Sequence, residues 1–121
     1  MVIANGGSAT CTITNDDNIA SPGISTAMNW TLNDESTLTG FLSGGGVSTV
    51  TFTLYNTVGC EVGSDVFSQT VNVNDLTGTA ATTTGYTTKV AGTYQWIASF
   101  NGNSYNAAIA TSCGDETTTL P

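Results

Sequence analysis

The feature of the sequence that most constrains the fold is an alternation of apolar and polar side chains, clearest in residues 47–55 and 93–100. Such an alternation is typical of a β-strand with one face against a core and the other in water. The apolar sides of the two stretches carry Val50, Phe52 and Leu54, and Tyr94, Trp96, Ala98 and Phe100, respectively. Both stretches are therefore predicted to be half-buried strands, with most of the aromatic core on the second.

Shorter stretches of a similar kind follow one another along the chain, separated by turn-forming residues. Strands are predicted over residues 24–32, 36–42, 66–73, 79–84 and 105–112, with Leu38 and Leu42 inward in the second of these. Asn101 and Gly102 predict a tight hairpin, because both residue types tolerate a positive φ. Threonine, which favours pleated strands, occurs along the whole chain. The sequence therefore predicts an all-β protein, an antiparallel β-sandwich of about seven or eight strands with an extra N-terminal strand.

Residues 1–20 are predicted to form that separate strand and a linker, ahead of a sandwich over residues 21–121. Residues 8–14 alternate and end at the polar cluster of residues 15–18. Without a partner strand in its own module, this segment could add to the sheet edge of a neighbouring module or copy, giving a head-to-tail polymer. The residues of this candidate strand-addition segment are Ser8, Thr10, Thr12, Ile13 and Thr14.

The charge of the chain is one-sided, with nine acidic residues, one lysine, no arginine and no histidine, giving a net charge of −8. Nucleic-acid binding is not expected, because lysine and arginine must neutralise the phosphates. Insertion into a membrane is not expected either, since no apolar run approaches the ~20 residues that a spanning helix needs. The chain has no histidine for a catalytic set and no paired carboxylates in an implied cleft. We therefore predict that the protein is not an enzyme and holds no cofactor.

Three cysteines, Cys11, Cys60 and Cys113, allow three different pairings, each of which leaves one thiol over. One disulfide with one remaining thiol is expected for an exported protein. Zinc is not expected, because no histidine and no C-x-x-C spacing are present. The acidic pairs at residues 16–17 and 115–116 could contribute oxygen ligands to calcium between modules, but they lack the spacing of a calcium-binding loop. They are predicted to be solvated turns, and no metal site is predicted.

Four stretches occur in a characteristic order: LTGFLSGG at residues 38–45, TVTFTLY at 49–55, DVFSQTV at 65–71 and AGTYQWIASF at 91–100. With these stretches, and with ATSCGDET at residues 110–117, the chain from about residue 21 onward resembles one repeat of the Ig-like domains that occur in tandem in large bacterial surface proteins. Residues 6–17, GGSATCTITNDD, resemble the closing strand of a different bacterial surface repeat that usually precedes such units.

The resemblance implies an Ig-like sandwich located outside the cell or at the cell surface. It also implies that Cys60 and Cys113 are disulfide partners, and that Cys11 pairs within a preceding domain. In the absence of such a domain, Cys11 would be a free thiol or would link to another chain.

The expected function is that of a non-enzymatic structural module, a stalk or building block of an extracellular bacterial array. Its expected partners are neighbouring repeats or copies of itself. Two alternatives stay open: a filament subunit that polymerises through its N-terminal strand, and an adhesin module that binds a glycan or a host protein. For such binding, Trp30 and Tyr55 are the aromatic residues predicted to be exposed, and Lys89 is predicted to be an ordinary exposed lysine.

Overall fold

The computed structural model of the protein describes residues 19–121, which fold into nine β-strands without a helix. The strands are β1 (Trp30–Leu32), β2 (Glu35–Thr37), β3 (Thr49–Tyr55), β4 (Asp65–Asn72), β5 (Thr79–Ala81), β6 (Tyr86–Thr88), β7 (Gly92–Phe100), β8 (Ile109–Ala110) and β9 (Glu116–Leu120). The all-β prediction is confirmed. The predicted strand at residues 8–14 and the thiol of Cys11 lie outside the described residues.

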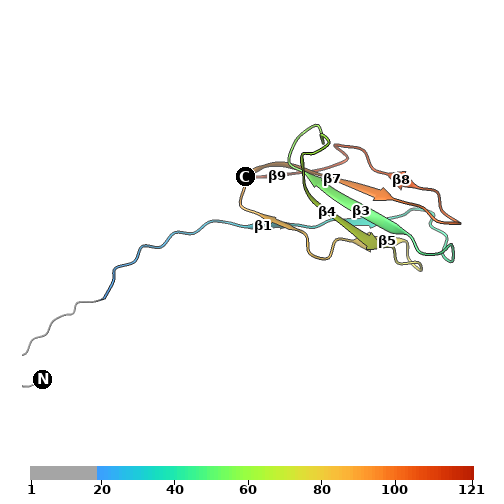
Figure 1. Ribbon diagram of the computed structural model, residues 1–121, viewed down its shortest axis with the longest axis horizontal. Coiled ribbons are helices and arrows are strands. Elements are labelled where there is room, and N and C mark those ends of the chain that lie inside the picture. Colours follow the sequence, from blue (N-terminus) through green and yellow to red (C-terminus); the bar gives the residue numbers. More distant parts are fainter. Residues whose placement is uncertain (1–18) are drawn as a thin grey trace, which may run out of the picture.

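The strands form two packed layers, both antiparallel (Figure 1). One layer is a five-stranded sheet in the order β4–β3–β7–β8, in which β9 pairs with β7 along the same edge as β8. The other layer consists of two short ribbons, β1 with β6 and β2 with β5, that follow one another along the chain. Two sheets whose apolar faces meet in this way make a β-sandwich.

The core of the sandwich is built from the two alternating stretches that the sequence singles out. Val50, Phe52 and Leu54 of β3 are at most 1% exposed. From the neighbouring strand β7, Trp96 packs edge-on against Phe52, with ring centroids 6.4 Å apart. The predicted core faces of both stretches are therefore confirmed, and the other face of β3 carries half-buried threonines.

The ribbons are separate because the chain is irregular between β1 and β2 and between β5 and β6. The hydroxyl of Thr82 accepts a hydrogen bond from the amide of Asp34 at 3.0 Å and donates one to Asn33 Oδ1 at 2.7 Å. Gly85 has a φ of 71°, and a Cβ at this position would lie 2.8 Å from the carbonyl oxygen of Leu32. Side-chain hydrogen bonds and a glycine thus replace the regular ladder at the junction of the two ribbons.

Two strand predictions for the N-terminal half are too long. The strand predicted over residues 24–32 begins only at Trp30, and residues 24–29 are exposed and have no strand partner among the described residues. The strand predicted over residues 36–42 ends at Thr37, and Leu42 is 60% exposed instead of inward. Leu38 does pack against the core, as predicted. Alternation alone does not make a strand, because a strand also needs a neighbour that accepts its backbone hydrogen bonds.

The predictions for the C-terminal half miss two strands and one connection. Asn101 and Gly102 do not form a two-residue hairpin, because Asn101 Oδ1 accepts the amide of Thr49 and residues 101–108 form a longer connection. The strand predicted over residues 105–112 shortens to β8. Strands β6 and β9 were not predicted, because they are rich in threonine and four of the five residues of β9 are exposed, so neither shows an apolar side.

Candidate functional site

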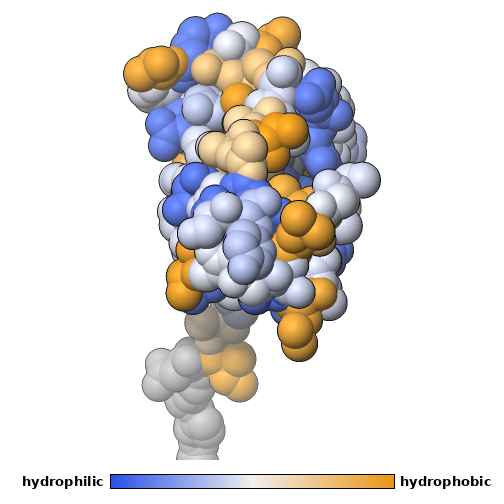
Figure 2. Space-filling model, turned by 90° about the vertical axis from the view of Figure 1, so that its right-hand side faces the viewer, coloured by the Kyte–Doolittle hydropathy of each residue, from blue (hydrophilic) through white to orange (hydrophobic). Residues whose placement is uncertain are grey.

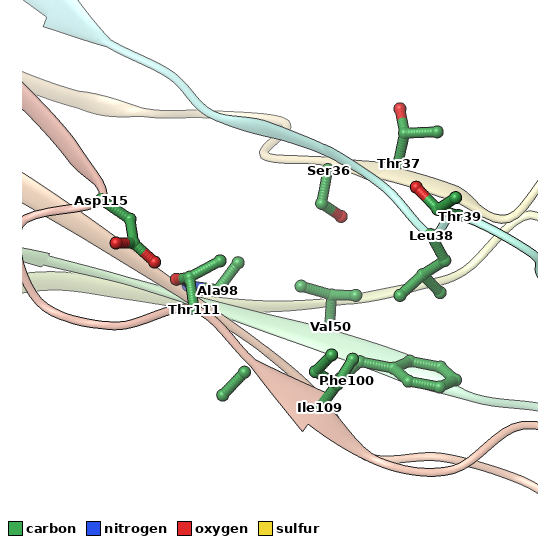
Figure 3. A pocket seen from close by; sticks show the side chains of 11 residues that line it. Ser36, Thr37, Leu38, Thr39, Val50, Ala98, Phe100, Ile109, Thr111 and Asp115 are labelled. Carbon is green, nitrogen blue, oxygen red and sulfur yellow. The ribbon is translucent and has the colours of Figure 1, made fainter.

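A groove opens between the two layers on the side of the sandwich where β8 lies (Figure 3). Its volume is about 380 Å³, and it separates the outer edge of β2 from the outer edge of the five-stranded sheet. Its lining reaches the core, since Val50 and Phe100 are 1% and 3% exposed, respectively. Its lining includes Thr37, Leu38, Val50, Phe100, Ile109 and Ala110.

Both strands that border the groove have an open hydrogen-bonding edge within the described residues, because β2 pairs with β5 alone and β8 with β7 alone. The amide of Leu38 donates to the carbonyl oxygen of Gly78 at 2.9 Å. Successive residues of a strand direct their amide and carbonyl groups to opposite edges, so those of Thr37 point away from β5. In the same way, the amide of Thr111 donates to the carbonyl of Ala98, so the backbone of Ala110 faces away from β7. The groove is thus flanked by peptide groups that can pair with an added strand.

The path of the chain distinguishes the two ends of the sandwich. Strand β1 begins at Trp30, which pairs with Thr88 at the end of β6, and β9 ends at Leu120, which pairs with Gly92 at the start of β7. Because only residues 89–91 separate β6 from β7, the chain enters and leaves the sandwich at the same end (Figure 1).

A disulfide braces this end of the sandwich. Cys60, in the connection between β3 and β4, is bonded to Cys113, in the connection between β8 and β9, with Cα atoms 6.0 Å apart. This is the pairing that the resemblance implies, and it joins residues 53 positions apart in the sequence.

The disulfide-linked connection of residues 56–64 covers Gln95, which lies on the outer face of β7 and is nevertheless 3% exposed. The Gln95 side-chain amide donates to the carbonyl oxygens of Thr57 at 3.0 Å and Val58 at 2.6 Å. Its oxygen accepts a hydrogen bond from the hydroxyl of Thr117 at 3.2 Å. The alternation in the sequence places the Gln95 side chain in water. It therefore does not predict that Gln95 holds this connection in place.

The opposite end of the sandwich carries three connections that hydrogen bonds tie together. Asn106 accepts the amide of Leu42 at 2.8 Å and donates to the carbonyl of Leu42, also at 2.8 Å. Asp75 accepts the amide of Gly44 at 2.8 Å. Figure 2 shows this end face-on, with apolar surface in separate patches. The exposed large apolar residues of these connections are Leu42, Val47, Leu76 and Tyr105.

An acidic depression lies at the junction of the two ribbons, lined by Asp34, Glu35 and Glu116 among others. Burial raises the pKa of the Asp34 carboxyl above its ordinary value of 3.8. The amide of Glu35, which donates to Asp34 Oδ1 at 2.8 Å, lowers it in part, whereas the charges of Glu116 and Glu35 raise it further. Within residues 19–121, no group of three or more His, Cys, Asp or Glu side chains is placed to hold a metal ion.

Replacing Asp34 by asparagine is expected to raise the free energy of unfolding at pH 7, because burial raises the pKa of the Asp34 carboxyl. A carboxyl whose pKa is raised in the folded state stabilises the fold only while it is protonated. That contribution is complete below the ordinary value of 3.8 and is lost as the pH rises through the raised pKa of the folded state. Asparagine keeps the acceptor for the Glu35 amide and carries no charge. Urea unfolding at pH 7 and pH 3 measures the effect.

At pH 3 the difference between Asp34→Asn and the wild type should largely disappear, since both side chains are then neutral. Asp65→Asn, at an exposed position in β4, provides the control and should change stability little at either pH. An equal loss of stability at both pH values in Asp34→Asn would show that packing, and not charge, governs this position.

The aromatic residues predicted to be exposed for ligand contact do not form a site. Trp30 is half-buried and packs against the core, so this prediction is wrong. Tyr55 is also half-buried, on the outer face of the five-stranded sheet, and neither residue lines the groove or the acidic depression. Of the acidic pairs, Asp115 accepts the amide of Ser112 at 2.9 Å and closes a turn, whereas residues 16–17 lie outside the described residues. Lys89 is exposed, as predicted.

Comparisons with protein-family models, with curated proteins and with solved structures found no match to this chain. The resemblance to bacterial Ig-like repeats therefore stays a prediction. In the part of the chain that the structure describes, no helix has the length and apolar character needed to cross a membrane.

Proposed function

We propose that the chain is a non-enzymatic, Ig-like building block of an extracellular bacterial assembly, which associates with neighbouring modules or with copies of itself. The observation that carries this proposal is the groove flanked by the open edges of β2 and β8. An exposed strand edge next to apolar surface is a template for pairing with another chain, and natural proteins commonly cover or charge such edges. Within residues 19–121 the groove-facing edge is left open, which favours a contact between molecules.

Two further features support an extracellular setting. The Cys60–Cys113 disulfide is compatible with an oxidising environment, where such bonds form and persist. Charged residues make up only 8% of the chain, and the polar surface is supplied mainly by uncharged residues such as threonine, serine and asparagine.

The path of the chain favours a building block over a stalk. The chain enters and leaves at the same end of the sandwich, so the domain lies to one side of the line through its neighbours. Modules of a stalk stack end to end, which requires the chain to enter at one end and leave at the other. In this arrangement, contacts between copies would instead be made through the exposed sides of the sandwich.

The full chain is expected to form species larger than a monomer at neutral pH, in proportions that rise with concentration. Because each copy carries a net charge of −8, raising the ionic strength should strengthen the association by screening the repulsion between copies. Sedimentation velocity over a wide range of concentration and salt tests this, and negative-stain electron microscopy would distinguish regular fibres from small oligomers. A chain that stays monomeric under all these conditions would contradict the proposal.

A second candidate function is that of an adhesin module, and the loop-bearing end of the sandwich favours it. The three connections at this end are tied together by Asn106 and Asp75 and present apolar side chains such as Leu76, which is 86% exposed. A rigid set of loops far from the points where the chain enters and leaves is a common place for ligand binding. If the chain is monomeric, this end is where a glycan or protein ligand should be sought.

A further inference from the structure

We propose that residues 24–29 of one copy insert as a β-strand into the groove of a second copy, so that the chain associates head to tail. This inference rests on the proposed function above and names the two surfaces that meet. Residues 24–29 are the donor segment, and the groove between β2 and β8 is the acceptor.

The donor segment has the pattern of a strand and no strand partner among the described residues. Ile24, Thr26 and Met28 alternate with Ser25 and Ala27 and therefore share one side of an extended chain. Ile24 is 94% exposed and Met28 is 68% exposed. An extended segment with an apolar side in water gains hydrogen bonds and apolar contact when it pairs with an open edge.

The segment runs outward from β1, away from the body of its own sandwich (Figure 1). To reach its own groove, the chain would have to reverse its direction immediately before Trp30. A tight reversal between strands favours residues that tolerate a positive φ, such as Asn-Gly. The favoured turn needs a positive φ at both central residues, and of the residues next to Trp30 only Asn29 tolerates one. The nearest glycine, Gly23, precedes the donor segment. The segment is therefore placed to meet the groove of another copy.

The acceptor groove matches the donor in both chemistry and hydrogen bonding. An added strand with its apolar side inward would place Ile24 and Met28 against a lining that includes Leu38, Val50 and Phe100. Its backbone would meet the open edge of β2 at Thr37 or that of β8 at Ala110. Ile109, which lines the groove and is 66% exposed, would be covered by the same strand.

Charge favours this segment as the occupant of the groove. Residues 19–29 contain no charged residue, although the whole chain has a net charge of −8. An uncharged strand can approach Asp115, which lies at the groove, without repulsion between like charges. The remaining repulsion between copies is long-ranged and is screened by salt.

The first test places charge on the inward side of the donor segment. Ile24→Asp with Met28→Asp is expected to weaken self-association at least about 100-fold, because burial of one large apolar side chain alone accounts for about tenfold or more. The control is Ser25→Asp with Ala27→Asp, which adds the same charge to the outward side and should retain association within a few-fold. All chains carry Cys11→Ser to exclude covalent dimers, and sedimentation velocity measures the association.

The second test disables the acceptor and then combines the two variants. Ile109→Asp places a charge in the groove and should weaken association to a similar extent, whereas Val62→Asp, at a fully exposed position outside the groove lining, should not. A mixture of Ile109→Asp with the Ile24→Asp, Met28→Asp chain should form heterodimers that do not grow further. Each heterodimer uses the one intact donor and the one intact groove, as expected for a head-to-tail contact.

Several results would overturn the inference. If the inward and outward donor variants associate as the parent does, residues 24–29 are not the donor, although the proposed function stands. If Ile13→Asp abolishes association and the donor variants do not, residues 8–14 supply the strand. Absence of association in the parent would reject both the inference and the proposed function. Thermal unfolding should show that every variant folds like the parent, because the substituted described positions are exposed.

Discussion

Replacing Trp96 by alanine is expected to lower the free energy of unfolding by about 3–5 kcal/mol. Trp96 is 4% exposed and packs edge-on against Phe52 and also against Phe67, with ring centroids 5.9 Å apart in the second pair. Alanine would remove the side chain that links β7, β3 and β4 in the core and would leave a cavity that the surrounding strands cannot fill. Domains of this size are commonly stable by only about 5–15 kcal/mol, so the variant should be close to unfolding.

Urea unfolding followed by far-ultraviolet circular dichroism measures this effect, because tryptophan fluorescence is itself changed by the substitution. The control is Ile97→Ala, at the next position of β7, where the side chain is half-buried on the opposite face. It should cost no more than about 1–2 kcal/mol. Similar losses at the two positions would mean that the two faces of β7 are equally buried, which contradicts the described packing.

Removing the disulfide by Cys60→Ser with Cys113→Ser is expected to lower the free energy of unfolding by about 4 kcal/mol. The bond closes a loop between residues 53 positions apart, and the entropy that it removes from the unfolded chain grows with the length of that loop. Loss of the bond would also free the connection of residues 56–64, which then stays in place only through hydrogen bonds such as those of Gln95.

The measurement compares urea unfolding with and without a reducing agent, in chains that carry Cys11→Ser to prevent disulfide exchange. The reducing agent should destabilise the chain that retains Cys60 and Cys113 and should leave the double serine variant unchanged. If the double serine variant is as stable as the oxidised parent, the bond adds nothing to the fold, and the hydrogen bonds around Gln95 are sufficient to hold this end.

The sequence was sufficient to predict those strands whose own residues alternate between apolar and polar side chains. The alternation in β3 and β7 identified the buried faces, including Phe52 and Trp96. It did not identify β6 and β9, because these strands have no continuous apolar side and are defined by the strands next to them. It also suggested a strand before Trp30, where none is paired among residues 19–121, since alternation shows which side of a chain is apolar and not whether a partner strand exists.

The candidate site was less accessible to prediction than the core. The groove exists because no strand of the described chain lies opposite β8, and this depends on the order of strands in two layers. No single stretch of sequence contains that information. The burial of Gln95 is hidden from the pattern for a related reason, because the connection that covers it is held there by the disulfide to Cys113. The cysteines alone allowed three pairings, and only the resemblance singled out the observed one.

Because the chain enters and leaves the sandwich at the same end, tension on the chain would act on the strands in a particular way. A pull through the chain on either side would act at Trp30 and Leu120 and would open β1 from β6 and β9 from β7 one residue pair at a time. Bonds that break in succession resist less than bonds sheared together, so extension would begin under small forces. The disulfide would then stop it, because the 53-position loop between Cys60 and Cys113 holds back about 19 nm of chain at about 3.6 Å per residue. Under such a load in an oxidising environment, the sandwich would therefore extend only to a fixed limit, and reduction of the disulfide would remove that limit.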